Sequence, residues 1–363
     1  MNKKFNYIQV ARAVAAIMVV LFHTGGAFAA EKYFSADIFG QLFRFGKYGV
    51  EFFFVLSGFI IFYVHHSDID HKYKVVEYIR KRLVRIYPMY WIVFLGLAFV
   101  SILVPSFRDG LPATPLIWIK SLLLFPQDPG VVGGTGAPLV IVAWSLQYEL
   151  VFYAFFAAFI YSLRLGFLLF IGCFVWWVAT WLGWVEVKFT FYFMESYLFL
   201  LFGLGVACAY VSQRQIPLPS VWLVVGSLCF VVLIVLSAAD VINEARMEYW
   251  QRVFLSLSYG GGSALVILGL VGLEQSKQRF VPRFARLLGD ASYVMYLTHY
   301  AVVSALIKVL SLYSNEAWWM MISFIFIVFV VCVSSVYFHL IFEKPVLRML
   351  NKRKSIRRDH YPT

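Results

Sequence analysis

The sequence predicts an all-α fold, a polytopic bundle of membrane-spanning helices. Hydrophobic residues make up 62% of the 363-residue chain, and its mean hydropathy is +0.79. Only 14% of the residues are charged, against about 25% in soluble domains. The apolar stretches are close to the ~20 residues that cross a bilayer as a helix. They do not alternate between polar and apolar side chains, as the strands of a membrane β-barrel do.

About ten such stretches follow one another along the chain. They lie at 8–30, 46–65, 88–105, 142–162, 165–184, 190–211, 219–238, 252–273, 291–312 and 317–342. The largest segment between them, 105–138, is rich in glycine and proline, so we expect an outer loop that caps a cavity. Its glycines precede no Lys-Ser/Thr pair, which argues against a phosphate-binding loop. We expect one membrane domain over 1–345 and a basic cytoplasmic tail over 346–363.

The basic residues predict the orientation of this bundle. With the N-terminus inside, Lys3, Lys4, the cluster at 80–85 and the tail all fall on one side, which predicts that both termini are cytoplasmic. The formal charge of +12 is segregated by loop, so it indicates topology and not nucleic-acid binding. A competing interpretation takes 1–29 as a cleaved signal peptide. Arg12 argues against it, because it interrupts what would be the apolar core of the signal.

The first predicted span carries two polar side chains on one face. Arg12 and His23 are eleven residues apart, which is close to three whole turns of an α-helix. A cation and an imidazole are costly in lipid, so we expect both to face a protein interior or a cavity. The rise of ~1.5 Å per residue places His23 beyond mid-depth toward the outer face, with Arg12 near the inner face.

Other titratable side chains are predicted at a comparable depth. Glu149 lies roughly two turns below the outer surface, Glu51 and Glu195 lie in the outer half, and His299 lies near the middle. One polar pocket would hold them all. Burial disfavours the charged forms unless they pair, and a His beside a Glu is a usual arrangement for a general base. The alternative for each is a single interhelical hydrogen bond.

A basic cluster meets the third predicted span at the cytoplasmic face. Arg82 and Arg85 are three residues apart, so a helix presents their two guanidinium groups together. Such paired forks suit phosphate oxygens, although anchoring to anionic lipid headgroups explains the cluster equally well. The four cysteines lie singly in apolar runs, so we expect no metal. Together the two clusters suggest an anionic ligand at the inner face and acid/base groups further out, and a transferase fits that layout.

Several motifs, taken in order, resemble the acyltransferase 3 family of bacterial membrane proteins that O-acylate sugars. They cover about 340 residues of the chain and form an ordered set. The motifs are Arg12 with His23, Gly49 to Phe59, Arg82 to Pro88, Trp144 to Glu149, Ser292 to His299 and Glu343 to Pro345.

The resemblance implies transfer of an acyl group, usually acetyl from acetyl-CoA, to a hydroxyl of a polysaccharide or lipid-linked glycan. It also implies a multi-pass protein of the bacterial cytoplasmic membrane. By resemblance His23 is catalytic together with Arg12 and Glu149, while Arg82 and Arg85, with Tyr87 in the same motif, hold the acyl-CoA donor. Glu51 stands where many relatives have Asp.

We therefore predict that His23, polarised by Glu149, takes the proton of the acceptor hydroxyl. Candidates for oxyanion stabilisation or substrate binding are Trp144, Ser145, Tyr148, Glu51, Glu195 and His299. The alternative is an exporter of a glycan or lipid-linked intermediate, since proton-coupled carriers also use intramembrane His, Glu and Arg. The chain has no visible repeat and no paired broken spans, which argues against a carrier.

Overall fold

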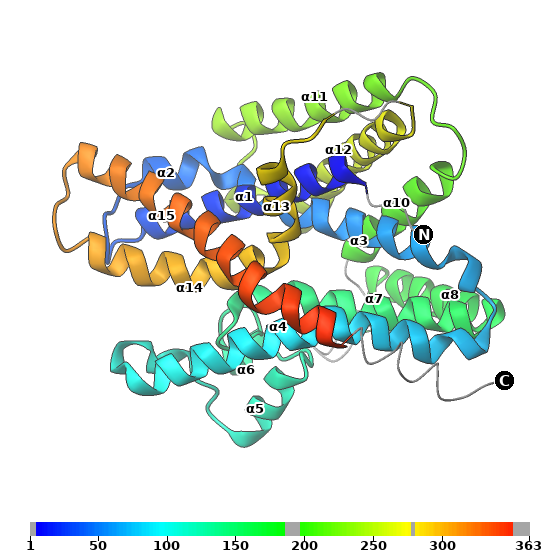
Figure 1. Cartoon of the computed structure of the whole chain (residues 1–363), viewed down its shortest axis with the longest axis horizontal. Helices are drawn as coiled ribbons and strands as arrows, with labels where there is room; N and C mark the ends of the chain where they lie inside the picture. The colour runs from blue at the N-terminus through cyan, green and yellow to red at the C-terminus, as the bar shows by residue number, and fades with distance from the viewer. Residues whose placement is uncertain (1–4, 186–196, 277–279, 351–363) are drawn as a thin grey trace. The chain divides into compact units, whose positions relative to one another are not determined.

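The computed structural model describes residues 5–185, 197–276 and 280–350 (Figure 1). Within these ranges the regular elements are helices and no strand occurs, which confirms the all-α prediction. The longer helices are α1 (Asn6–Ala29), α3 (Gly49–His65), α4 (Val75–Leu103), α7 (Trp144–Tyr161), α8 (Leu163–Trp181), α10 (Leu198–Val211), α11 (Pro219–Ala238), α12 (Tyr249–Ser276), α14 (Ser292–Leu310) and α15 (Ala317–Phe338). Short elements that bear on the site are α2 (Asp37–Leu42), η1 (Arg44–Tyr48), α5 (Pro115–Leu122), α6 (Pro129–Val132), α13 (Arg283–Asp290) and the π-helical turn η8 (His339–Glu343).

Nine helices in the described ranges are long and apolar enough to cross a membrane. The protein is therefore an integral, multi-pass membrane protein, as predicted. The predicted span 190–211 begins outside the described residues, and its described part is the shorter apolar helix α10. The predicted loop 105–138 is partly helical, because it contains α5 and α6.

Helix α4 begins much earlier than the predicted third span, which starts at residue 88. It runs from Val75, so the basic cluster at 80–85 forms the first turns of the same helix. Pro88 lies inside it. A proline at an interior position removes one backbone hydrogen bond, and the helix nevertheless continues to Leu103.

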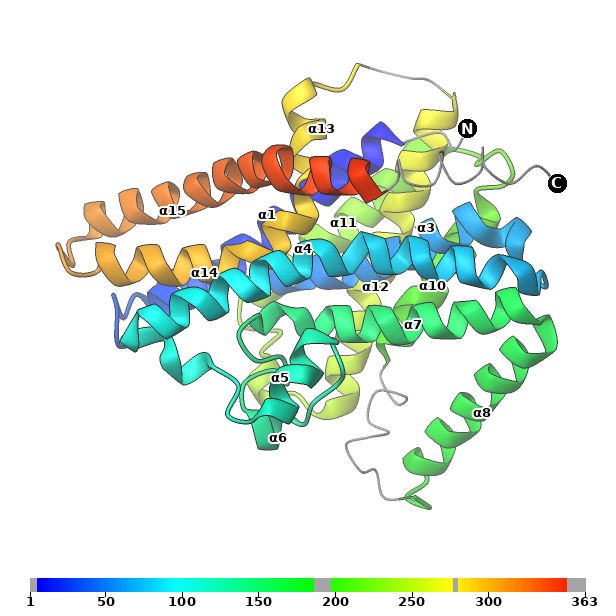
Figure 2. The same cartoon turned by 60° about the horizontal axis from the view of Figure 1, so that its bottom comes forward.

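The chain forms two compact units, whose longer helices are labelled in Figure 2. Unit 1 comprises the described parts of 1–66 and 197–336, and unit 2 those of 67–196 and 337–363. A cluster of aromatic rings joins α1, α2 and α15 in unit 1. There Phe39 of α2 stacks on Phe324 of α15 with ring centroids 4.9 Å apart, and Phe28 of α1 lies 5.1 Å from Phe39.

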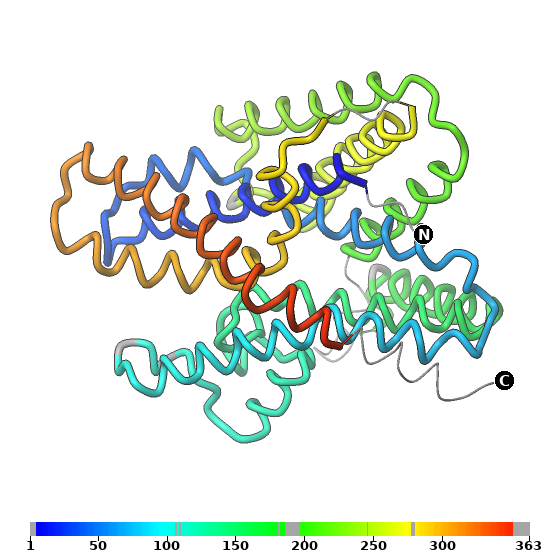
Figure 3. Tube along the Cα trace, in the orientation of Figure 1, coloured from blue at the N-terminus to red at the C-terminus, as the bar shows by residue number. Residues whose placement is uncertain are grey.

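Helices α3 and α10 pack closely in unit 1 although they are far apart in the sequence (Figure 3). Glycines allow this approach. A Cβ at Gly205 would overlap the Val55 carbonyl oxygen and lie 2.6 Å from the Phe59 nitrogen, and a Cβ at Gly58 would overlap the carbonyl of Phe202. Small residues commonly bring membrane helices into such close contact, because lipid provides little hydrophobic force between them.

Gly205→Ala is therefore expected to lower the thermal unfolding midpoint by several degrees, since overpacking of this kind costs about 1–3 kcal/mol. Gly203→Ala is the matched control, because a Cβ at Gly203 meets no atom within 4 Å. Melting curves of the detergent-solubilised protein measure both. Equal midpoints for the two variants would contradict the proposed role of Gly205 in packing.

Candidate active site

Two histidines from α1 and α14 meet inside unit 1. His299 Nε2 lies 3.1 Å from His23 Nδ1, and the two ring centroids are 4.9 Å apart. His299 is completely buried. The sequence predicts both imidazoles in one polar pocket, and the structure brings these two together.

The surrounding carbonyls indicate which nitrogens carry protons. His299 Nδ1 lies 3.0 Å from the carbonyl oxygen of Met295 and 2.8 Å from that of Tyr296. A carbonyl only accepts, so we assign the proton of the neutral His299 ring to Nδ1, which leaves Nε2 as an acceptor. His23 Nδ1 then faces two acceptors, because the Val19 carbonyl oxygen lies 3.0 Å from it. We assign the His23 proton to Nδ1 as well, which places the lone pair of His23 on Nε2.

Arg12 lies on the same helix as His23 but has a separate environment. Its Nη1 donates to Gln9 Oε1 at 3.2 Å. Eleven residues of helix separate it from His23, which corresponds to about 16 Å along the axis. Within unit 1 the two residues that define the motif are therefore far apart, and Arg12 does not belong to the histidine pair.

Glu51, a predicted substrate-binding residue, connects two helices of unit 1. Its buried carboxylate accepts a hydrogen bond from Ser256 Oγ of α12 at 2.9 Å. Nearby, Tyr48 stacks on Tyr259 with centroids 3.7 Å apart and donates to Glu244 at 2.8 Å. These contacts hold the start of α3 against α12, which agrees with the simpler expectation of an interhelical hydrogen bond for Glu51.

Glu149 belongs to unit 2, so its predicted pairing with His23 stays a prediction. Its partner within unit 2 is Tyr153, whose hydroxyl donates to Glu149 Oε1 at 2.5 Å. The Tyr153 ring also lies beside Arg82, with the guanidinium carbon 5.7 Å from the ring centroid and 5.6 Å from that of Tyr78. A cation over an aromatic face is attracted by the ring quadrupole. Tyr153 thus links the carboxylate of Glu149 to the guanidinium group of Arg82.

Arg85 has a different set of contacts from Arg82. Its Nη1 donates to Glu343 Oε1 at 3.0 Å, and Glu343 Oε2 lies 2.6 Å from His339 Nδ1. Glu343 is buried and belongs to η8. The sequence places Arg82 and Arg85 on one helix face, but it assigns no role to Glu343 beyond its place in the last motif.

The remaining predicted residues of unit 2 that the structure describes are Tyr87, Trp144, Ser145 and Tyr148. Tyr87 donates its hydroxyl hydrogen to the Leu123 carbonyl oxygen at 2.6 Å. The Ser145 hydroxyl donates to the Val142 carbonyl oxygen at 3.2 Å. The rings of Trp144 and Tyr148 meet edge to face at 6.0 Å.

Two further predictions concern Glu195 and the metal content of the site. Glu195 lies outside the described residues. Among the described residues no three His, Cys, Asp or Glu side chains gather in a group that would hold a metal ion.

The fold defines an integral membrane protein of the all-helical class, with a pair of imidazoles inside unit 1. The chain belongs to the acyltransferase 3 family, whose sequence model, described as an acyltransferase domain, matches residues 5–337. The protein is therefore a membrane acyltransferase, and the resemblance predicted from the motifs is confirmed.

One curated relative gives a more specific comparison. The chain is 28% identical over 283 residues to the exopolysaccharide production protein ExoZ of Rhizobium meliloti (strain 1021), covering 76% of this chain and 82% of that protein. No solved structure matches the chain.

Proposed function

We propose that the protein transfers an acetyl group from acetyl-CoA to a hydroxyl of a surface or exported polysaccharide, in the bacterial cytoplasmic membrane. The family supports acyl transfer, and the name of the relative supports a polysaccharide acceptor. The observation that carries the proposal is the hydrogen-bonded pair of His23 and His299, because it leaves a basic nitrogen on His23.

His23 acts as the general base in this proposal. Its Nε2 takes the proton of the acceptor hydroxyl while the hydroxyl oxygen attacks the thioester carbonyl carbon. A carbon–oxygen bond forms, the carbon–sulfur bond breaks, and the CoA thiolate leaves with the proton that His23 returns. His23 becomes positively charged during the step. Its Nδ1–H group then donates to the Val19 carbonyl and to His299 Nε2, which stabilises that charge.

The donor binds through the arginines of α4. Guanidinium groups bind phosphate oxygens through two parallel hydrogen bonds, and Arg85 has a side chain that is 35% exposed. Glu343 holds Arg85, and Glu149 acts on Arg82 through Tyr153. With both termini cytoplasmic, the cytoplasmic pool of acetyl-CoA reaches these arginines. With the N-terminus cytoplasmic, the end of α1 that carries His23 lies toward the outer face.

Release of the CoA thiol tests this function against export. Purified protein in lipid nanodiscs is given acetyl-CoA and polysaccharide from cells that lack the protein, after chemical deacylation. We expect free thiol to appear at a rate that rises with the polysaccharide concentration. Movement of polysaccharide across proteoliposomes without thiol release would identify an exporter and contradict the proposal.

A further inference from the structure

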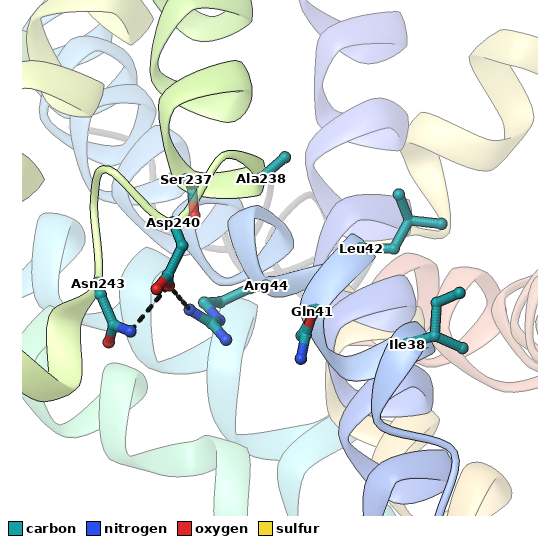
Figure 4. Close-up of a pocket in the computed structure, with 8 residues that line it drawn as sticks. All are labelled: Ile38, Gln41, Leu42, Arg44, Ser237, Ala238, Asp240 and Asn243. Carbon is teal, nitrogen blue, oxygen red and sulfur yellow. Dashed lines mark hydrogen bonds and ion pairs between the residues drawn. The ribbon is translucent and has the colours of Figure 1, made fainter.

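A pocket of about 500 Å³ opens in unit 1 beside η1, and we call it the η1 pocket (Figure 4). Its volume falls in the range of ~300–1,000 Å³ that small-molecule sites occupy. The pocket could not be predicted from local sequence patterns, because its two walls are about 200 residues apart along the chain. The lining residues are Ile38, Gln41, Leu42, Arg44, Ser237, Ala238, Asp240 and Asn243.

The η1 pocket lies close to the turn of α1 that carries His23. The element η1, which contributes Arg44 to the pocket, packs directly on that helix. A Cβ at Gly46 would overlap the Met18 carbonyl oxygen and lie 3.1 Å from the Cβ of Phe22. The Phe22 ring in turn lies edge to face with the His23 ring, with centroids 4.9 Å apart. The element that contributes Arg44 to the pocket thus contacts the turn of α1 next to His23.

Hydrogen-bonding groups of both kinds line the η1 pocket. Asp240 supplies carboxylate acceptors, Arg44 supplies donors, and the amides of Gln41 and Asn243 supply both. Figure 4 shows Asp240 and Asn243 on one wall, Gln41 and Leu42 on the other, and Arg44 between them. Such a wall suits neighbouring sugar hydroxyls, since each hydroxyl donates one hydrogen bond and accepts others.

Several side chains of the polar wall contact one another or a neighbouring arginine. Asp240 accepts from Asn243 Nδ2 at 2.8 Å and pairs with Arg44 at 4.0 Å and with Arg246 at 3.6 Å. Its backbone φ of 56° lies in the left-handed region, which Asp tolerates better than most residues. Exposed Ile38 adds apolar surface of the kind that contacts the C–H face of a sugar ring.

We propose that the η1 pocket binds one sugar unit of the polysaccharide acceptor, next to the unit whose hydroxyl reaches His23. The assignment rests on the function proposed above. It adds a substrate-binding site formed by α2, η1 and the segment 237–243, with Arg44, Asp240 and Asn243 as its main hydrogen-bonding residues.

The test compares two arginines that share one partner. Arg44 and Arg246 both pair with Asp240, but only Arg44 lines the η1 pocket. The probe is a mixture of oligosaccharides released from the deacylated polysaccharide of cells lacking the protein. Its binding is measured without donor, by saturation-transfer NMR on the protein in nanodiscs. Acetyl transfer to the same oligosaccharides is measured separately.

We expect Arg44→Gln to raise the oligosaccharide Kd and the acceptor KM by about tenfold, the effect of losing hydrogen bonds from a charged group. The KM for acetyl-CoA and the kinetics of Arg246→Gln should stay at wild-type values. Gln41→Ala should raise the acceptor KM as well. Because this substitution breaks no ion pair, it tests the pocket even if the Arg44 variant misfolds.

Equal Kd values for the Arg44→Gln and Arg246→Gln variants would overturn the proposed site. So would a rise in the acetyl-CoA KM alone, because the pocket would then serve the donor. Because binding is measured without donor, the outcome does not depend on catalysis. If the wild-type protein binds the oligosaccharides through Arg44 but transfers no acetyl group, the binding site is supported and the proposed function is contradicted.

Discussion

His23→Ala is expected to lower kcat for acetyl transfer by about a hundredfold to ten-thousandfold, the usual contribution of a general base. The KM values for donor and acceptor should change little, because the imidazole acts on the reacting proton and not on binding. Alanine removes the lone pair on Nε2 and the hydrogen bond to His299. Rates of labelled acetyl transfer by the purified variant measure the effect.

The matched control is His66→Ala. His66 is exposed and its ring nitrogen contacts only its own segment, 3.3 Å from the Tyr63 carbonyl oxygen. We expect wild-type kcat for it. Comparable yields and elution profiles for the two variants will show that His23→Ala inserts and folds. A His23→Ala protein with undiminished kcat would exclude His23 as the base.

The second large effect is expected at His299, which we assign as a positioning residue. His299→Ala should lower kcat by about tenfold to a hundredfold, because small misplacements of a catalytic group cost this much. The KM values of the His299→Ala variant for donor and acceptor should stay unchanged. His299→Gln should recover part of kcat, since a glutamine oxygen can take the place of Nε2 and accept from His23 Nδ1. His299→Asn should not recover kcat, because the shorter amide takes the place of Nδ1 and not of Nε2.

This series separates orientation from space filling. If His299 only fills space in the bundle, the loss of kcat will depend on the side-chain volume removed, and the His299→Asn and His299→Gln variants will show similar kcat values. Equal activity of those two variants would therefore contradict the assigned role. Recovery by Gln alone would support an acceptor at the Nε2 position as the feature that matters.

The membrane spans could be predicted because length and hydropathy alone decide them. The sequence also predicts that His23 and His299 lie in one polar pocket. It does not predict that they touch, because nothing local to either histidine specifies that α1 and α14 are neighbours. That contact results from the packing of the whole unit, in which the apolar cluster joins α1, α14 and α15.

Arg82 and Arg85 show more clearly how little the spacing of residues in the sequence predicts about their contacts. A separation of three residues correctly places Arg82 and Arg85 on neighbouring turns of one helix. Their contacts differ, however, because Arg82 lies against Tyr78 and Tyr153 whereas Arg85 pairs with Glu343, 258 residues away. The η1 pocket could not be predicted for the same reason, since Arg44 and Asp240 come together only in the folded unit.

Whether His23 drives acyl transfer to a polysaccharide is seen in the mass of that polysaccharide. Cells lacking the protein are complemented with the wild-type chain or with His23→Ala at equal membrane levels, and their purified polysaccharides are compared by mass spectrometry. We predict that the wild-type chain adds the mass of one acetyl group to the repeating unit and that the variant adds none. Identical acetylation of the polysaccharide from the two kinds of cells would exclude this role of His23.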